Sequence, residues 1–411
     1  MSPISKIILS SGALLAVGLP SACGNAVADK PRSAPSTPAT QPAATQPAAT
    51  QPAATQPAAT QPARPAAVAG DAVLAGLSPQ QLAGQRVIYS YGGPTPPASL
   101  LAKISLGEAA GVIFFNGNIS SLDQIRVVIK ELQQANKKSP VRAPLLMLTD
   151  QEGGLVRRLP GAPVLAERQV GRSPNGMLLA SQAGTGAGHN LRGVGMNVNL
   201  APVLDVYRKA GDFLDQFQRS YSGNASRVSQ LGSTFITAQQ QAGVAATAKH
   251  FPGLGAAATA QNTDLRPVTL DLSLPSLRGV DEASYQAAIA AGVHLVMVSW
   301  AVYPAFDAHW PAGLSSTIVE KELRQRLRFR GVTVTDALEA GALRAFGTLP
   351  VRGVLAARAG LDLLLFSGEN VSDGINGASA LARALRGGTL GRAAFLTSVK
   401  RVIALRTSLA R

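Results

Sequence analysis

The feature that most constrains the fold of this 411-residue chain is a repeated alternation that begins near residue 70. Short apolar runs rich in β-branched residues are separated by longer stretches with helical spacing, such as "STIVEKELRQRLR", in which Ile318, Leu323 and Leu327 recur. Eight such runs with interleaved helices favour an α/β fold, a (β/α)8 TIM-like barrel, over an open doubly wound sheet. The runs are "RVIYSY" from Arg86, "GVIFFN" from Gly111, "PLLMLTD" from Pro144, "MNVNLAPVLDV" from Met196, "VAATAKHF" from Val244, "VHLVMVSW" from Val293, "GVTVTDA" from Gly331 and "LDLLLFSG" from Leu361.

Polar residues stand where these runs end. In a barrel, side chains at the carboxyl ends of the strands converge on one site. The first turn has no G-x-G-x-x-G, which argues against a dinucleotide-binding fold. The set is rich in carboxylates but has too few His and no Cys for a metal site, so we expect neither metal nor organic cofactor. The expected site residues are Asn116, Asp150, Asp205, His250, Ser299, Asp336 and Ser367.

Five ordered motifs lie along the same runs. They are "TDQEGGLVRRL" from Thr149, "NVNLAPVLDV" from Asn197, "QRSYS" around Arg219, "AKHFPG" around Lys249 and His250, and "VTDALEAGA" around Asp336. Together they resemble glycoside hydrolase family 3, specifically the single-domain β-N-acetylglucosaminidases of bacterial cell-wall recycling, over residues 70–411. The resemblance implies that Asp336 is the nucleophile of a retaining glycosidase.

The same resemblance implies that five residues hold the sugar, namely Asp150, Arg158, Arg219, Lys249 and His250. A retaining glycosidase needs a carboxylate that attacks the anomeric carbon, and Asp336 follows an apolar strand, which suits that role. Each residue also has a structural interpretation. Asp336 would serve as a helix N-cap, and Lys249 and His250 would be a paired lysine and a satisfied histidine in the core.

The loop that follows "AKHFPG" departs from the family. Relatives usually carry Asp-Ser-His there as an acid/base dyad, but the corresponding positions fall on Ala260, Gln261 and Asn262. A general acid must reach the glycosidic oxygen, and the nearest carboxylic acid is Asp264. Three explanations remain open: Asp264 replaces the histidine, only good leaving groups are cleaved, or the barrel binds sugar without cleaving it.

The amino-terminal region predicts export. Residues 1–22 have a lysine and a short apolar run, as in a signal peptide, and Cys23 follows "LPSA", which resembles a lipobox. We therefore expect Cys23 to carry a lipid, although a cleaved signal with an incidental cysteine is the alternative. Residues 23–69, with repeated "ATQPA", are expected to form an extended tether ahead of the domain at 70–411.

The net charge of +15 is scattered and contains no basic run. For an exported chain this does not predict a nucleic-acid partner. The expected partners are carbohydrate, namely N-acetylglucosamine-containing saccharides of the cell wall, and the membrane through the lipid. The expected place is the outer face of the cell membrane, and no obligate protein partner is evident. The alternatives are a sugar-binding lipoprotein and a β-glucosidase of the same family.

Overall fold

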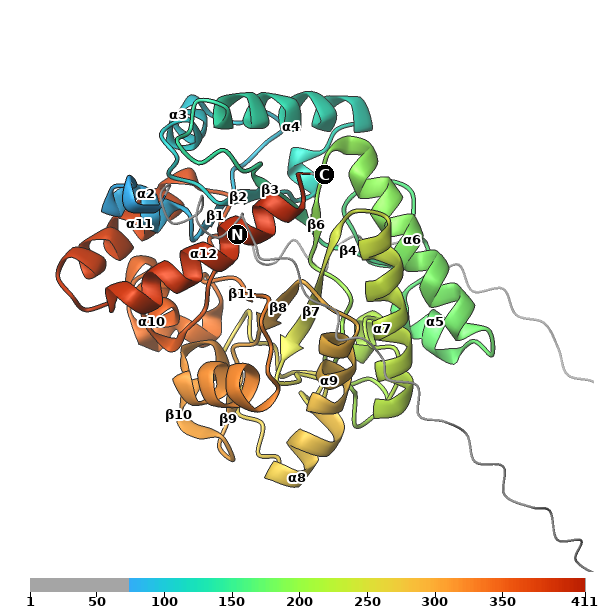
Figure 1. Cartoon of the computed structure of the whole chain (residues 1–411). Helices are drawn as coiled ribbons and strands as arrows, with labels where there is room; N and C mark the ends of the chain where they lie inside the picture. Colours follow the sequence, from blue (N-terminus) through green and yellow to red (C-terminus); the bar gives the residue numbers. More distant parts are fainter. Residues whose placement is uncertain (1–73, 411) are drawn as a thin grey trace, which may run out of the picture.

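The protein folds as a parallel barrel. The structure is a computed structural model of the chain and describes residues 74–410. Within that range all eight runs form strands of one parallel sheet in the order β11-β8-β7-β6-β3-β2-β1-β12, and a bridge between Val334 and Leu363 joins its two edges. The predicted barrel is therefore confirmed (Figure 1). Its strands are β1 (Val87–Tyr89), β2 (Gly111–Ile113), β3 (Leu146–Thr149), β6 (Val198–Asn199), β7 (Ala245–Phe251), β8 (Leu295–Val298), β11 (Val332–Thr335) and β12 (Leu364–Leu365).

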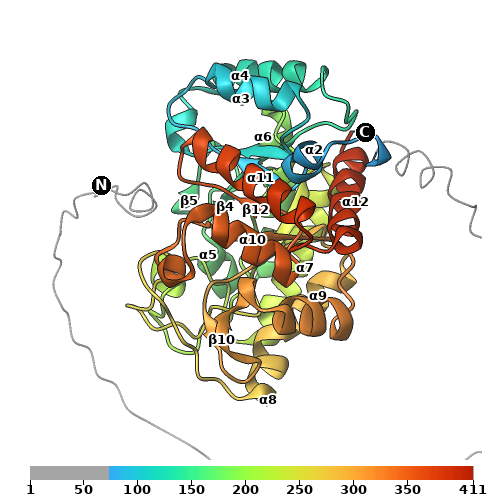
Figure 2. The same cartoon turned by 90° about the vertical axis from the view of Figure 1, so that its left-hand side faces the viewer.

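Helices surround the barrel on its outside (Figures 1 and 2). The α-helices are α2 (Pro79–Gly84), α3 (Ala98–Ser105), α4 (Leu122–Asn136), α5 (Glu167–Arg172), α6 (Gly176–Val194), α7 (Ala225–Gln241), α8 (Leu274–Ser276), α9 (Glu282–Ala290), α10 (Leu349–Ala359), α11 (Val371–Arg386) and α12 (Arg392–Ser408). Short 3₁₀ helices are η2 (Asn116–Asn118), η3 (Asp215–Phe217), η5 (Ala312–Leu314) and η7 (Gly341–Phe346), and π-helices are η4 (Leu277–Asp281) and η6 (Thr317–Arg326). The segment predicted to be helical around Ile318 is therefore the π-helix η6.

Two antiparallel hairpins interrupt the repeat, and both follow carboxyl ends of barrel strands. The first pairs β4 (Gln151–Gly153) with β5 (Val156–Arg157) after β3. The second pairs β9 (Val302–Tyr303) with β10 (Asp307–Pro311) after β8. Neither hairpin was predicted from the sequence. Each adds backbone at the end of the barrel where the predicted site lies.

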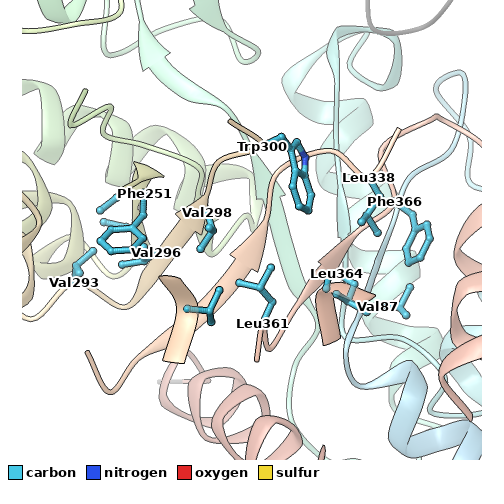
Figure 3. Close-up of a cluster of buried hydrophobic side chains, with 14 of the residues drawn as sticks. Val87, Phe251, Val293, Val296, Val298, Trp300, Leu338, Leu361, Leu364 and Phe366 are labelled. Carbon is cyan, nitrogen blue, oxygen red and sulfur yellow. The ribbon is translucent and has the colours of Figure 1, made fainter. Parts of the chain in front are cut away.

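The core is divided into two layers by the alternation of side chains along each strand. In β8, Leu295 and Met297 join a cluster inside the barrel, whereas Val296 and Val298 join the layer between strands and helices. Figure 3 shows part of that outer layer, with Val296 beside Phe251. A period of two explains why the strand sequences are apolar on both faces.

Helix α12 closes the amino-terminal end of the barrel. Its Val402 and Leu405 belong to the cluster inside the barrel. Arg401 Nη1 lies 3.1 Å from Asp362 Oδ1, and Arg406 Nε donates to the carbonyl of Pro144 at 2.8 Å. Because these partners precede β12 and β3, the helix covers the strand starts and the opposite end carries the loops. Over residues 74–410, no helix has the length and apolar character needed to cross a membrane.

Candidate functional site

The predicted residues meet at the carboxyl end of the barrel. Asp150 directly follows β3, and Asp336 directly follows β11. Lys249 and His250 stand just before Phe251, the last residue of β7. Asp205 lies in the segment after β6, which pairs with β7 through a bridge between Val203 and Lys249. Parallel strands present their carboxyl ends on the same side. The sheet topology therefore gathers residues that are separated by almost 190 positions in the sequence.

A buried ion network occupies one side of the site. Lys249 Nζ lies 2.7 Å from Asp150 Oδ1 and 2.6 Å from Glu152 Oε1, and Lys249 is 1% exposed. Glu152 also accepts two hydrogen bonds of 2.8 Å from Arg219, from Nε and Nη2. Burial alone would raise the pKa of Glu152, but Arg219 and Lys249 outweigh it and hold that pKa at about 2. Asp150 and Glu152 likewise raise the pKa of Lys249 against the effect of its burial.

The network fixes two cations and two carboxylates at this end of the barrel. Lys249 and Arg219 stay charged, and the carboxylates orient them. Such an arrangement suits binding of hydroxyl groups, because charged donors and acceptors of fixed direction make strong hydrogen bonds. The structural interpretation of Lys249 as a paired core lysine is met as well, since its two carboxylates account for its burial.

His250 is oriented by Asp205. Its ring nitrogen Nδ1 lies 2.8 Å from Asp205 Oδ2, and its backbone N–H donates to the same oxygen at 3.1 Å. The other oxygen of Asp205 accepts the backbone N–H of Leu254 at 2.5 Å. An ionised carboxylate only accepts hydrogen bonds, so the hydrogen between the two groups is on Nδ1, and Nε2 is the ring nitrogen left for another partner. Asp205 thereby sets both the imidazole and the first turn of the loop after β7.

Asp336 is held at the end of its strand. Its backbone N–H donates to the carbonyl of Val298 at 3.4 Å, and its Oδ1 accepts the N–H of Ala337 at 2.7 Å. The next helix is η7, which begins at Gly341 with Ala340 at its N-cap. Asp336 is therefore not the cap of that helix. A partly exposed carboxylate on a strand end is suitably placed to act on a bound substrate.

Asp264 lies in the β7–α8 loop (residues 252–273), which is docked on the segment after Asp336. The backbone carbonyl of Asp264 accepts the N–H of Gly341 at 2.8 Å. The carbonyl of Thr263 accepts the N–H of Ala342 at 3.0 Å. The side chain of Asn262 accepts the N–H of Asp264 at 2.8 Å. Burial and then the charge of Asp336 raise the pKa of Asp264 to about 6, although Arg219 and His250 oppose them. The two carboxyl groups thus influence each other electrostatically.

Arg158 contacts Asn116 and Gln151 rather than Asp150. Its Nη1 donates to Asn116 Oδ1 at 3.2 Å, and its backbone N–H donates to Gln151 Oε1 at 3.0 Å. The ion-pair partner of Asp150 is Lys249 rather than Arg158. Arg158 Nε is buried and has no hydrogen-bond partner among residues 74–410.

Two glutamates of the site were not predicted. Glu152 belongs to the motif "TDQEGG", two residues after Asp150. The signal that could have found it is Lys249, because a lysine on a fully buried strand requires a carboxylate. Glu167, on α5, accepts the N–H of Val203 at 2.9 Å through Oε1. Burial raises the pKa of Glu167 well above its ordinary value, and the charge of Glu152 acts in the same direction. No pattern in the sequence distinguishes Glu167 from a surface residue of its helix.

Comparisons with known proteins agree on one family. Residues 94–405 match the model of the glycosyl hydrolase family 3 N terminal domain. An uncharacterized secreted glycosyl hydrolase of Arthroderma benhamiae is 48% identical over 346 residues, which are 84% of this chain and 97% of that protein. A beta-hexosaminidase of Thioalkalivibrio sulfidiphilus is 33% identical over 266 residues, 63% of this chain and 73% of its own length.

The same family is found among solved structures. A glycoside hydrolase family 3 beta-N-acetylglucosaminidase from Paenibacillus sp. superimposes with a TM-score of 0.77 and 34% identity. The match covers 82% of this chain, which spans only 63% of the length of the Paenibacillus protein.

Proposed function

Because the chain belongs to glycosyl hydrolase family 3, and is thus a glycoside hydrolase, we propose that it removes terminal β-linked N-acetylglucosamine from saccharides with retention of configuration. The observation that carries the proposal is the pair Asp336 and Asp264 at the carboxyl end of the barrel. One is a partly exposed carboxylate on a strand end, and the other has its pKa raised to about 6. A nucleophile and a proton donor with different environments are what double displacement at a sugar requires. The β-hexosaminidase relative supports the choice of sugar.

The proposed reaction has two steps. Asp336 attacks the anomeric carbon while the bond to the leaving oxygen breaks, and Asp264 gives that oxygen its proton. Water then attacks the same carbon, passes its proton to Asp264 and releases Asp336. Asp150, Lys249 and Arg158 are assigned to binding of the sugar hydroxyls. His250 and Arg219 are assigned to binding of the same sugar. The chemistry is carried by side chains alone.

We assign Asp264 to the role of the Asp-Ser-His dyad that the loop lacks. Asn262 stands two residues before Asp264 and accepts its backbone N–H. The loop is therefore ordered around Asp264 by its own side chains as well as by η7. This assignment favours a hydrolase over a sugar-binding barrel, which remains the second candidate because the dyad itself is missing.

One assay tests the function directly. We expect p-nitrophenyl N-acetylglucosaminide to be cleaved much faster than p-nitrophenyl glucoside, and Asp336→Asn to reduce turnover to background while the fold is kept. Faster cleavage of the glucoside would identify a β-glucosidase instead. If the protein cleaves neither substrate but still binds N-acetylglucosamine, it is a sugar-binding protein rather than a hydrolase.

We also propose that the enzyme acts on peptidoglycan-derived saccharides from a lipid anchor at Cys23. That cysteine, the signal peptide and the tether lie outside the described residues. Export is supported by the Arthroderma relative, which is named a secreted protein. The anchor predicts that the mature protein sediments with membranes and that Cys23→Ser releases it. Recovery of Cys23→Ser in the membrane fraction at the wild-type level would rule out the anchor.

A further inference from the structure

One short segment donates hydrogen bonds both to the backbone of the residue after Asp336 and to the backbone of the loop that carries Asp264. The β8 extension, which we define as residues 299–303, continues from the end of β8 into β9. Ser299 and Tyr303 are fully buried and Trp300 is 1% exposed. Ser299 N–H donates to the carbonyl of Phe251 at 2.8 Å, which attaches the extension to the end of β7. None of these residues carries a charge, so the proposed chemistry gives them no direct part.

Trp300 contacts the nucleophile side. Its indole Nε1–H donates to the carbonyl of Ala337, the residue after Asp336, at 2.8 Å. The N–H of Ala337 in turn donates to Asp336 Oδ1. Trp300 therefore fixes the peptide segment that orients the Asp336 carboxylate. Figure 3 shows the ring between Val298 and the segment of Leu338. A methyl group at Gly313 would lie 2.4 Å from the ring, so the ring is closely packed on that side.

Tyr303 contacts the other side. Its hydroxyl donates to the carbonyl of Gly253 at 2.9 Å and lies 3.0 Å from Ser299 Oγ. Gly253 is in the first turn of the β7–α8 loop, which leads to Asp264. Burial raises the pKa of Tyr303 well above its ordinary value, so the hydroxyl keeps its hydrogen and remains a donor. The extension therefore holds the backbone at both Asp336 and the start of the loop.

We propose that Trp300 and Tyr303 are positioning residues that place the nucleophile and the proton donor separately. The inference rests on the roles proposed above for Asp336 and Asp264. A displacement of about 1 Å costs on the order of 10²-fold in rate when reacting groups must be aligned. Loss of the Trp300 hydrogen bond disturbs the attack on the sugar, which every substrate requires. Loss of the Tyr303 hydrogen bond disturbs protonation, which only poor leaving groups require.

The experiment uses Trp300→Phe and Tyr303→Phe in the full chain, each measured as kcat/KM on two substrates. The dinitrophenolate of dinitrophenyl N-acetylglucosaminide leaves without a proton. The sugar leaving group of N,N′-diacetylchitobiose must be protonated as it departs. We expect Trp300→Phe to lower both values by about tenfold or more, to a similar extent. We expect Tyr303→Phe to lower the chitobiose value by about tenfold and the dinitrophenyl value by less than about twofold.

Two matched variants control for the substitutions. Tyr285→Phe removes another fully buried hydroxyl, which has no hydrogen-bond partner among the described residues, and should change neither substrate. Trp310→Phe alters a half-buried tryptophan of β10 that packs against Phe346, with ring centres 5.4 Å apart and ring planes tilted by 33°, and should change kcat/KM to the same extent for both substrates. Circular dichroism and the Tm of each variant report whether the fold is kept.

The outcomes distinguish this inference from the function on which it rests. If the two variants lower kcat/KM for the two substrates in the same ratio, or lower neither value, the separate positioning roles of Trp300 and Tyr303 are wrong. If they differ as described, the roles stand. Asp336→Asn and Asp264→Ala are run beside them. Full activity of Asp336→Asn would overturn the proposed function itself, whatever the two aromatic variants do.

Discussion

Two carboxyl groups at the same end of this barrel, those of Glu152 and Asp264, differ in the charges that lie beside them. Glu152 has two cations within hydrogen-bonding distance, and its pKa falls to about 2. For Asp264, burial and the neighbouring charge of Asp336 raise the pKa to about 6. The first remains ionised at every physiological pH, whereas the second can exchange a proton near neutrality. A carboxyl group that stays ionised suits the holding of two cations, as at Glu152, whereas one that titrates near neutrality suits the proton transfer proposed for Asp264.

The raised pKa of Asp264 predicts a pH dependence. Its acid form can donate a proton, so kcat/KM for N,N′-diacetylchitobiose should fall as the pH rises through about 6. In Asp264→Ala this decline should vanish, and the rate should drop by about 10²–10⁴-fold. With the dinitrophenyl substrate, release of the leaving group should lose little, but hydrolysis of the glycosyl-enzyme, for which Asp264 is the proposed base, should slow. Azide should then restore turnover of that substrate by attacking the glycosyl-enzyme. Persistence of the same decline in Asp264→Ala would assign it to another group.

Glu152→Gln tests the ion network. The change leaves Lys249 and Arg219 buried without their shared carboxylate, and breaking a buried pair costs about 3–5 kcal/mol of unfolding free energy. Urea unfolding of the wild type and the variant near pH 7 measures the difference. Because the folded pKa of Glu152 lies below its ordinary value of 4.5, the stabilisation is present above about 4.5 and declines toward pH 2. A loss below about 1 kcal/mol would mean that the network contributes little.

Sequence predicted the polar residues that stand on strand ends but not those that support them. Asp150, Lys249, His250 and Asp336 each follow or end an apolar run, and the period of a strand places them at the barrel mouth. Glu167 supports the site from a helix, and Trp300 contacts it through one indole hydrogen. Whether such residues reach the site depends on how the helices and loops pack, which no local pattern encodes.

At the level of elements, the strands were predictable because each is buried on both faces and therefore apolar throughout. The hairpins β4–β5 and β9–β10 were not, since they are short and their pairing depends on the barrel ends from which they extend. The docking of the β7–α8 loop on η7 was not predictable either. It rests on backbone hydrogen bonds, which any sequence can make once the two segments are adjacent.

Gly341→Ala tests that docking. A methyl group at position 341 would lie 2.2 Å from the carbonyl oxygen of Leu265 and 2.9 Å from that of Asp264, so the loop must move. We expect kcat/KM for N,N′-diacetylchitobiose to fall by about tenfold or more, because Asp264 is displaced. Gly193→Ala, on helix α6, is the matched control, since nothing beyond the backbone of its own helix turn lies within 4 Å of the added methyl group. Equal activity of both variants would show that the loop does not depend on this contact.

For the whole molecule, the barrel is closed at one end by α12 and carries all the proposed chemistry at the other. Residues 24–66, which we expect to form a tether, precede the barrel in the sequence and contain almost no large apolar residue to bury. Deletion of residues 24–66 should therefore leave the Tm of the barrel unchanged, as measured by scanning calorimetry of the two forms. A clear decrease in Tm would show that the tether packs against the domain.

The central claim is that Asp336 attacks the sugar, and covalent trapping tests it most directly. A 5-fluoro N-acetylglucosaminyl fluoride slows the second step more than the first, so the glycosyl-enzyme accumulates. Peptide mass spectrometry should then find one added sugar on the peptide that contains Asp336, and none in Asp336→Asn. An enzyme that hydrolyses p-nitrophenyl N-acetylglucosaminide but carries the label on another residue, or carries none, would contradict the account.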